Sequence, residues 1–149
     1  MSKGRFLIKS ENFKYSFAIY SRDVLMVKLK DIKRGYYIVH SDEPCVVKNV
    51  QLKGDSVILL AEGIFSGKQY KLNEHHDKEV NLSFKRGVAQ LIELKKKHAV
   101  IIDDQTYDSY EAEFDPALLK ENDAKVGDQV IYIKYKDRVK IVDVRKELF

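Results

Sequence analysis

The chain has little cysteine, no long apolar run and no pattern of a secretory signal at its start. Its single cysteine, Cys45, excludes a disulfide within the chain and fits a reducing compartment. No stretch of about 18 consecutive apolar residues occurs, so the sequence predicts no membrane span. The opening residues MSKGRFLIKS lack the apolar segment and small-residue cleavage site of a secretory signal. We therefore expect a cytoplasmic protein.

Motifs that carry metal or phosphate chemistry are also missing. The glycines fall in isolated turns rather than in a phosphate-binding loop, and a single cysteine cannot supply a paired-cysteine zinc site. His75 and His76 are adjacent, and adjacent residues on a strand point to opposite faces. We interpret them as an exposed pair in a linker rather than as metal ligands. The sequence thus predicts no metal site, no cofactor and no small-molecule substrate.

Candidate catalytic groups are equally weak. Cys45 follows Pro44 at the start of an apolar run, which favours a buried small hydrophobe over a nucleophile. Asp103 and Asp104 fall in an expected turn, which favours solvating groups over a paired carboxylate for acid–base work. We therefore expect no catalytic residue and no enzyme.

The charge is mildly basic and unevenly spread. The 149 residues are 44% apolar and 34% charged, as in folded globular proteins, with a net charge of +4. Residues 1–25 carry five bases and two acids, a net charge of +3. Residues 26–77 carry eight bases and seven acids (+1), and residues 78–149 carry fourteen bases and fourteen acids (0). Nine acids and two lysines lie between Asp103 and Asp128, and six bases and two acids between Lys134 and Lys146. Such a basic stripe permits a polyanion partner, but a solvated strand face explains it as well.

Short runs of β-branched and aromatic residues, separated by turn residues, dominate the chain. Strands spaced about 8–12 residues apart are typical of small barrels or sandwiches. One helix is expected, with Asp115 as its cap, Pro116 at its first position and ALLKEN following. The polar stretch NEHHDK at residues 73–78 is the best candidate boundary. We therefore expect an extension at residues 1–25, one small barrel at residues 26–77 and a second at residues 78–149.

The N-terminal extension has two interpretations. Phe13, Tyr15, Phe17 and Ile19 alternate with smaller or polar residues, which indicates a strand or a hairpin added to the first barrel. The alternatives are a disordered basic arm, or an artefact of an upstream start before Met26. The alternation favours the added strand.

Aromatic and basic residues are mixed in the last expected hairpin. The last two strands expected in the second barrel carry Tyr132, Lys134, Tyr135, Lys136 and Arg138. On a barrel face these side chains could stack on bases and follow phosphates. Alternatively, the tyrosines fill the barrel wall and the cations are solvated, which is the more ordinary outcome.

Several stretches resemble the translation initiation factor 5A / elongation factor P family. VKLKDIKRGYYIVHSDEPCVVKNV and AEGIFSGK resemble that family's first barrel, VAQLIELKKKHAVIIDDQTYDSYEAEF the opening of its second, and VGDQVIYIKYKDRVKIVDV its last hairpin. The resemblance covers about residues 26–149. It implies a mostly β fold, with an SH3-like (translation-protein, KOW-type) barrel followed by an OB-fold barrel with one short helix.

The resemblance also implies a function in protein biosynthesis at the ribosome, beside the peptidyl-tRNA. In that family a lysine modified to hypusine lies at the tip of a long loop, with a Pro-Gly-Lys-His-Gly-like sequence, between the EPC strand and the next one. Here only Gln51, Leu52, Lys53, Gly54 and Asp55 separate Val50 from Ser56, which is the length of an ordinary hairpin connection. The chain resembles a divergent member without this loop. Lys53 is the only positional candidate, and we expect no modified lysine.

We therefore expect a translation-factor-like protein that binds the ribosome or a tRNA-like RNA, without hypusine-dependent stimulation of peptide-bond formation. The candidate RNA-contacting residues are Lys33, Arg34, Lys53, Lys68, Lys134, Lys136 and Arg138. The alternative is a self-associating scaffold with the same fold, because the Woronin-body core protein of filamentous fungi also resembles this family without the modified lysine. The chain ends in Glu147, Leu148 and Phe149 rather than in a peroxisomal tripeptide, which weighs against that particular role.

Overall fold

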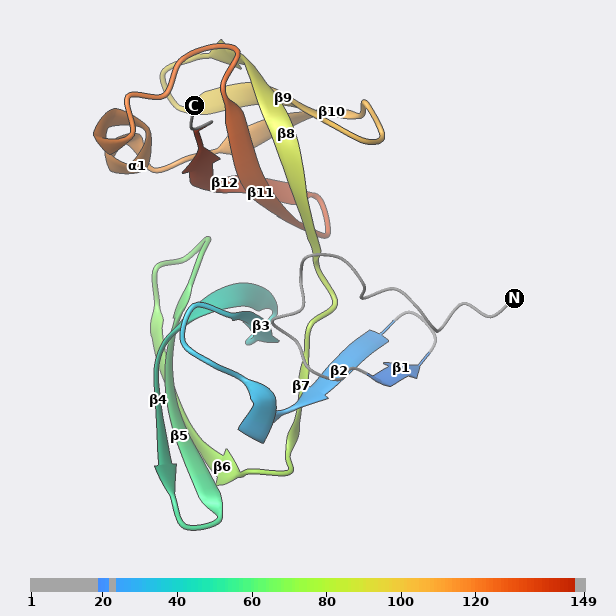
Figure 1. Ribbon diagram of the computed structural model, residues 1–149, viewed down its shortest axis with the longest axis vertical. Coiled ribbons are helices and arrows are strands. Elements are labelled where there is room, and N and C mark those ends of the chain that lie inside the picture. The colour runs from blue at the N-terminus through green and yellow to red at the C-terminus, as the bar shows by residue number, and fades with distance from the viewer. Residues whose placement is uncertain (1–18, 22–23, 147–149) are drawn as a thin grey trace. The chain divides into compact units, whose positions relative to one another are not determined.

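The computed structural model describes residues 19–21 and 24–146, and these residues form two compact units. Figure 1 shows that both consist mostly of strands, with one short α-helix. The two units meet in sequence between Ser83 and Phe84. No helix within the described residues is long and apolar enough to cross a membrane.

The first unit is a seven-stranded sheet with the order β1-β2-β7-β3-β4-β5-β6. Its strands are β1 (Ile19–Ser21), β2 (Val24–Lys28), β3 (Tyr37–His40), β4 (Glu43–Lys53), β5 (Ser56–Gly63), β6 (Gln69–His75) and β7 (Glu79–Asn81), with the short 3₁₀ helix η1 (Leu29–Asp31) after β2. All of its pairings are antiparallel, and the β4–β5–β6 meander forms its longest part.

Period-2 alternation explains the core of this sheet. Along β5, Val57, Leu59 and Ala61 are fully buried, and the residues between them face outward to varying degrees. Cys45 is buried on β4, as its apolar context predicts, and burial together with the nearby Glu43 charge raises the pKa of its thiol to about 12. Since a thiol with so high a pKa carries almost no thiolate at neutral pH, Cys45 acts as a packing residue.

The second unit is a closed barrel with the order β10-β12-β11-β8-β9. Its elements are β8 (Lys85–Leu94), β9 (His98–Asp103), β10 (Ser109–Glu113), α1 (Pro116–Glu121), β11 (Gln129–Tyr135) and β12 (Arg138–Arg145). The five strands and the helix between the third and fourth strands are the arrangement of an OB-fold. The expected fold class, an SH3-like unit followed by an OB-fold barrel with one short helix, is thereby confirmed.

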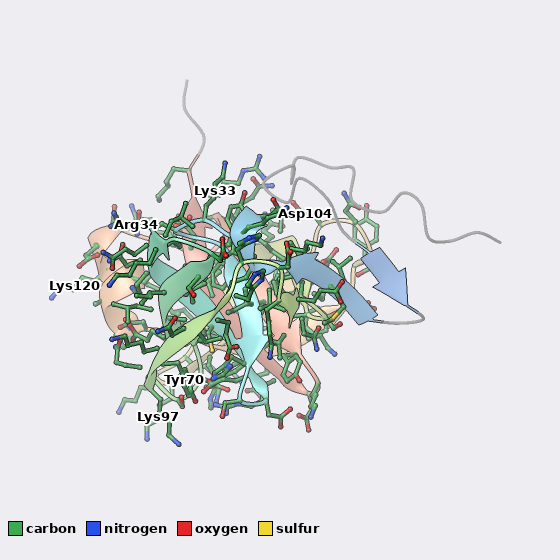
Figure 2. The ribbon with its side chains drawn as sticks, turned by 90° about the horizontal axis from the view of Figure 1, so that it is seen from below. Lys33, Arg34, Tyr70, Lys97, Asp104 and Lys120 are labelled. Atoms are coloured by element: carbon green, nitrogen blue, oxygen red, sulfur yellow. The ribbon has the colours of Figure 1, made fainter. Side chains whose placement is uncertain are left out.

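The helix forms as its sequence predicts. Asp115 accepts a hydrogen bond from the Ala117 amide at 3.0 Å, and Pro116 occupies the first helical position. Leu119 then packs into the core of the second unit. The helix therefore covers part of the barrel core, and its exposed residue Lys120 projects away from the ribbon (Figure 2).

The unit boundary differs from the expected one, and only part of the expected N-terminal extension lies within the described residues. The unit boundary lies six residues later than expected, because Val80 on β7 pairs with Val27 on β2 and Asn81 pairs with Val39 on β3. The stretch NEHHDK consequently forms the end of β6 and the β6–β7 turn, both within the first unit. In the extension, β1 pairs with β2, while the proposed hairpin and the residues Phe13, Tyr15 and Phe17 lie outside the described residues.

Candidate functional site

The β4–β5 hairpin, where the resemblance implies a long loop, closes in a two-residue turn. Lys53 pairs directly with Ser56, and Gly54 has a φ of 61°, as the favoured two-residue hairpin turns require at their first central position. A further backbone hydrogen bond holds the tip, since the His76 amide donates to the Asp55 carbonyl at 2.8 Å. The tip is therefore the end of a three-stranded meander and not a free finger.

Side chains at this tip face solvent. Leu52 is 69% exposed, and Gln51 and Lys53 are exposed beside it. The Lys53 ammonium group forms no ion pair within the described residues. It remains close to the sheet surface because its backbone belongs to the last pair of the β4–β5 ladder.

The structure brings only some of the predicted contact residues of the first unit together. Lys33 and Arg34 are exposed on one turn, which two backbone bonds attach to Val47 on β4 (Figure 2). Lys68 is exposed in the turn after β5, close to the Cys45–Gly63 end of the hairpin, while Lys53 lies at its opposite end. The first unit thus offers one paired cationic turn and two separate lysines.

In the second unit the predicted cations share the β11–β12 hairpin. The Lys134 ammonium group donates to the Lys136 carbonyl at 2.8 Å, and the Lys136 ammonium group lies 5.4 Å from the Tyr135 ring centroid. The Arg138 guanidinium binds both carboxylate oxygens of Glu113, at 2.8 and 3.0 Å. This hairpin is therefore cationic, but Arg138 already has a carboxylate partner.

Sequence reasoning missed a cationic turn. Lys95, Lys96 and Lys97 are all exposed in the β8–β9 connection, and Lys97 projects away from the ribbon in Figure 2. Of the three, Lys95 lies 3.7 Å from Glu111. The run of three lysines in the sequence was the available signal. The first and last loops of an OB-fold commonly contact oligonucleotides, and here both are basic.

Tyr132 belongs to the barrel interior rather than to a stacking surface. It is fully buried, and its hydroxyl donates to the Asp103 carboxylate. Burial and the Asp103 charge raise its pKa above the usual tyrosine value. Gly87 makes room for the ring, since a Cβ there would lie 2.8 Å from it. Between the two interpretations of this tyrosine, barrel filling is correct.

Asp103 was interpreted as a solvating group, and the structure corrects this. It is 3% exposed, and its Oδ1 accepts the amides of Gln105 and Thr106 at 2.7 and 2.9 Å. Burial alone would raise its pKa, but the bond from Tyr132, these two amides and the Lys85 charge lower the pKa to about 2. Asp104 is exposed, as expected. The pair is not an acid–base dyad, since the two carboxylates have separate partners.

Glu43 is the corresponding buried acid of the first unit, and sequence reasoning did not identify it. Its carboxylate accepts the amides of Phe65 and Ser66 and the hydroxyls of Ser66 and Tyr70. Burial opposes its ionised form, yet these bonds outweigh burial and lower its pKa. Gly63 lies so close beneath it that any Cβ would overlap the carboxylate. No pattern in the sequence pairs residue 43 with a turn some twenty residues later.

The adjacent histidines are arranged differently from the prediction. The His75 and His76 rings stack at 4.4 Å, and their ligand atoms and an Asp77 oxygen all lie within 4.8 Å of one another. The strand rule does not apply, because β6 ends at His75 and the chain turns there. Lys28 and Lys30 also approach Asp77, at 4.0 and 3.8 Å, and their charges oppose a bound cation.

Comparison with known proteins finds relatives along most of the chain. No family model matches. The chain is 28% identical over 134 residues to translation initiation factor 5A of Pyrococcus horikoshii, covering 84% of this chain and 97% of that protein. It is 24% identical over 131 residues to translation initiation factor 5A of Methanopyrus kandleri, covering 83% and 96%.

Solved structures agree on the fold. The protein described as eukaryotic translation initiation factor 5A from Methanococcus jannaschii superimposes with a TM-score of 0.66 at 19% identity, over 87% of this chain and all of that one. A protein described as a translation initiation factor 5A family protein from Naegleria fowleri superimposes with a TM-score of 0.54 at 18% identity. The match covers 83% of this chain and 99% of that one. The chain therefore resembles translation initiation factor 5A in sequence over more than four-fifths of its length, and it has the same two-unit fold as these solved structures.

Proposed function

We propose that this protein is a translation-factor-like protein of the cytoplasm that binds the ribosome or RNA and acts without a modified lysine. The first part is supported by its relatives, which are named translation initiation factor 5A. The sequence similarity extends over nearly their whole length. One observation carries the second part. The β4–β5 hairpin turns over Gly54 and Asp55 alone, where the resembled family has an extended loop.

The hairpin geometry supports a function without the hypusine mechanism. A modified lysine acts at a distance only if a long loop carries it away from the barrel. Lys53 instead precedes a tight turn whose Asp55 carbonyl is tied to the His76 amide. Its side chain cannot reach further than its own length from the sheet surface.

Binding would then rest on basic turns of the two barrels. In the OB-fold unit, the first loop offers Lys96 and Lys97, and the last offers Lys134 and Lys136. The sheet face beside β10 is less suitable for phosphate, because Glu111 and Glu113 project from it. In the first unit, Lys33 and Arg34 are the best placed pair. Basic loops around an acidic strand face support a backbone-contacting mode of RNA binding.

Ribosome co-sedimentation across a salt series tests the binding. If lysines and arginines contact phosphates, log affinity should fall with log salt by roughly 0.7–0.9 for each phosphate contact. The double variant Lys33→Glu/Arg34→Glu should bind less tightly and with a shallower slope. Lys120→Glu, an equally exposed lysine on α1, is the control and should behave as the unaltered chain. Salt-independent binding, or no binding, would contradict the proposal.

Intact-mass measurement of protein from its native host tests the absence of modification. Lys53 should be unmodified, because the enzymes that form hypusine must engage an extended loop. A mass increase of the size of hypusine, mapped to Lys53 by peptide analysis, would contradict it.

A further inference from the structure

The β9–β10 turn is built around the Asp103 carboxylate and ends in an exposed aromatic residue. The Tyr107 amide donates to the Asp103 carbonyl and the Asp103 amide to the Asp108 carbonyl, both at 2.9 Å. The Thr106 hydroxyl accepts the Asp108 amide at 3.2 Å. Together with the two amides on the Asp103 carboxylate, these bonds hold the turn in one conformation. Figure 1 shows it as the connection at the end of the β9–β10 hairpin.

The same pattern of hydrogen bonds occurs in the first unit, in the turn after β5. The Gly67 amide donates to the Gly63 carbonyl and the Gly63 amide to the Lys68 carbonyl, both at 2.9 Å. The Ser66 hydroxyl accepts the Lys68 amide at 3.1 Å. Gly67 therefore occupies the position that Tyr107 occupies in the second unit.

That position requires a left-handed backbone. Gly67 has a φ of 75°, which glycine adopts without strain, whereas Tyr107 has a φ of 63°. A bulky residue in this region is uncommon and strained. Glycine would satisfy the turn, as the first unit demonstrates, so the fold itself does not explain the tyrosine.

Tyr107 also contributes nothing to the core. It is 77% exposed, and within the described residues its ring and hydroxyl have no hydrogen bond or ring contact. A strained, exposed aromatic residue on a rigid turn is the arrangement expected of a contact residue for a partner.

The charges around Tyr107 indicate which partner fits. Asp104 and Asp108 are exposed on the same turn, which carries no cation of its own. The Lys85 ammonium group lies 3.7 Å from the buried Asp103 carboxylate and donates to the Tyr110 hydroxyl at 3.5 Å. An aromatic face beside two carboxylates attracts an arginine or lysine side chain and repels phosphate.

We infer that Tyr107, together with Asp104 and Asp108, forms a docking point for a lysine- and arginine-rich segment of a protein partner. The cationic side chain lies over the Tyr107 ring, and the two carboxylates neutralise its charge. This surface belongs to the OB-fold unit and differs from the basic turns proposed to bind RNA. It does not depend on the state of Lys53.

Fluorescence anisotropy with the full chain and a labelled octapeptide of alternating arginine and lysine tests the inference. Tyr107→Gly keeps every charge and relaxes the backbone, yet it should weaken peptide binding by about 3- to 10-fold, since it removes the cation–π contact. Tyr107→Phe keeps the ring and should bind within about twofold of the unaltered chain. A melting temperature of Tyr107→Gly at or above that of the unaltered chain excludes loss of folding as the cause.

A matched charge control separates docking from general attraction to acids. Asp108→Asn should weaken binding, whereas Asp123→Asn, which removes one charge from an exposed acid paired with Lys125, should not. Three results would overturn the inference. The first is equal peptide affinity of Tyr107→Gly and the unaltered chain. The second is an equal loss of peptide affinity in Asp108→Asn and Asp123→Asn. The third is Tyr107-dependent binding of a labelled uridine octamer that is tighter than binding of the peptide.

Discussion

The turn after β5 and the turn after β9 have the same backbone hydrogen bonds but obtain their carboxylate from different places. In residues 63–68 the acceptor is Glu43, which belongs to the neighbouring strand β4. In residues 103–108 it is Asp103, the first residue of the turn itself. The comparison shows that the turn requires an acceptor for two inward-pointing amides, and that the chain can supply it locally or from a distant residue.

The two carboxylates, Glu43 and Asp103, link different structural elements. Glu43 links β4 to the turn and to Tyr70 on β6, so it joins three strands of the first sheet. Asp103 links its own turn to Tyr132 on β11, across the barrel interior. In each unit a glycine, Gly63 or Gly87, leaves the space that this arrangement needs. Burying a carboxylate is unfavourable unless its oxygens are hydrogen-bonded, and here each has several donors.

The largest expected effect is loss of a buried acid. Asp103→Ala leaves the Tyr132 hydroxyl and two turn amides without their acceptor, and should lower the free energy of unfolding of the second unit by about 3 kcal/mol or more. Its exposed neighbour provides the control, because Asp104→Ala should change stability by less than about 0.5 kcal/mol. Denaturant unfolding, followed separately for the two units, measures both. Similar values for the two variants would mean that the Asp103 network contributes little.

Acid should weaken the second unit through the same group. The pKa of Asp103 is about 2 in the folded chain, below the ordinary aspartate value of 3.8, so its ionised form stabilises the fold. That stability is fully present above pH 3.8, and about 2 kcal/mol of it is lost as the pH falls from 3.8 to about 2. Denaturant unfolding between pH 5 and pH 2 measures this loss. Asp103→Asn should be less stable at neutral pH and should lose less on acidification, and an equal pH dependence would refute the assignment.

A smaller effect distinguishes the left-handed positions of the two turns. At both Gly67 and Tyr107, glycine should be more stable than alanine by about 1 kcal/mol, because only the strain of a positive φ separates the two residues. A Cβ at Gly67 would meet nothing within 4 Å, so no clash complicates the comparison. Melting curves of Gly67→Ala against the unaltered chain, and of Tyr107→Gly against Tyr107→Ala, give the two differences. A preference for alanine at either position would show that the turns are not equivalent.

The sequence predicted the elements governed by local rules. The helix followed from Asp115 and Pro116, and the strands followed from their alternating apolar residues. The short hairpin was visible because Gly54 and Asp55 stand between two strand patterns. The unit boundary was misplaced because polar residues at 73–78 indicate a turn without indicating which sheet the next strand joins.

The buried acids show where sequence reasoning stops. Asp103 and Asp104 are identical residue types in adjacent positions, yet one is buried and one is exposed, because only Asp103 faces Tyr132. Nothing local distinguishes them. The exposure of Tyr107 likewise depends on the tertiary structure. An aromatic residue between strands ordinarily predicts core packing. The basic turn at Lys95, Lys96 and Lys97 could have been identified from the sequence alone.

The most direct test of the account compares ribosome binding by protein from two sources. One sample comes from the native host, and the other from a host without the enzymes that modify lysine to hypusine. If the short hairpin has removed the need for a modified lysine, both samples should co-sediment with ribosomes with the same affinity and the same salt dependence. Binding by the native-host protein alone, with a mass increase at Lys53, would contradict the account.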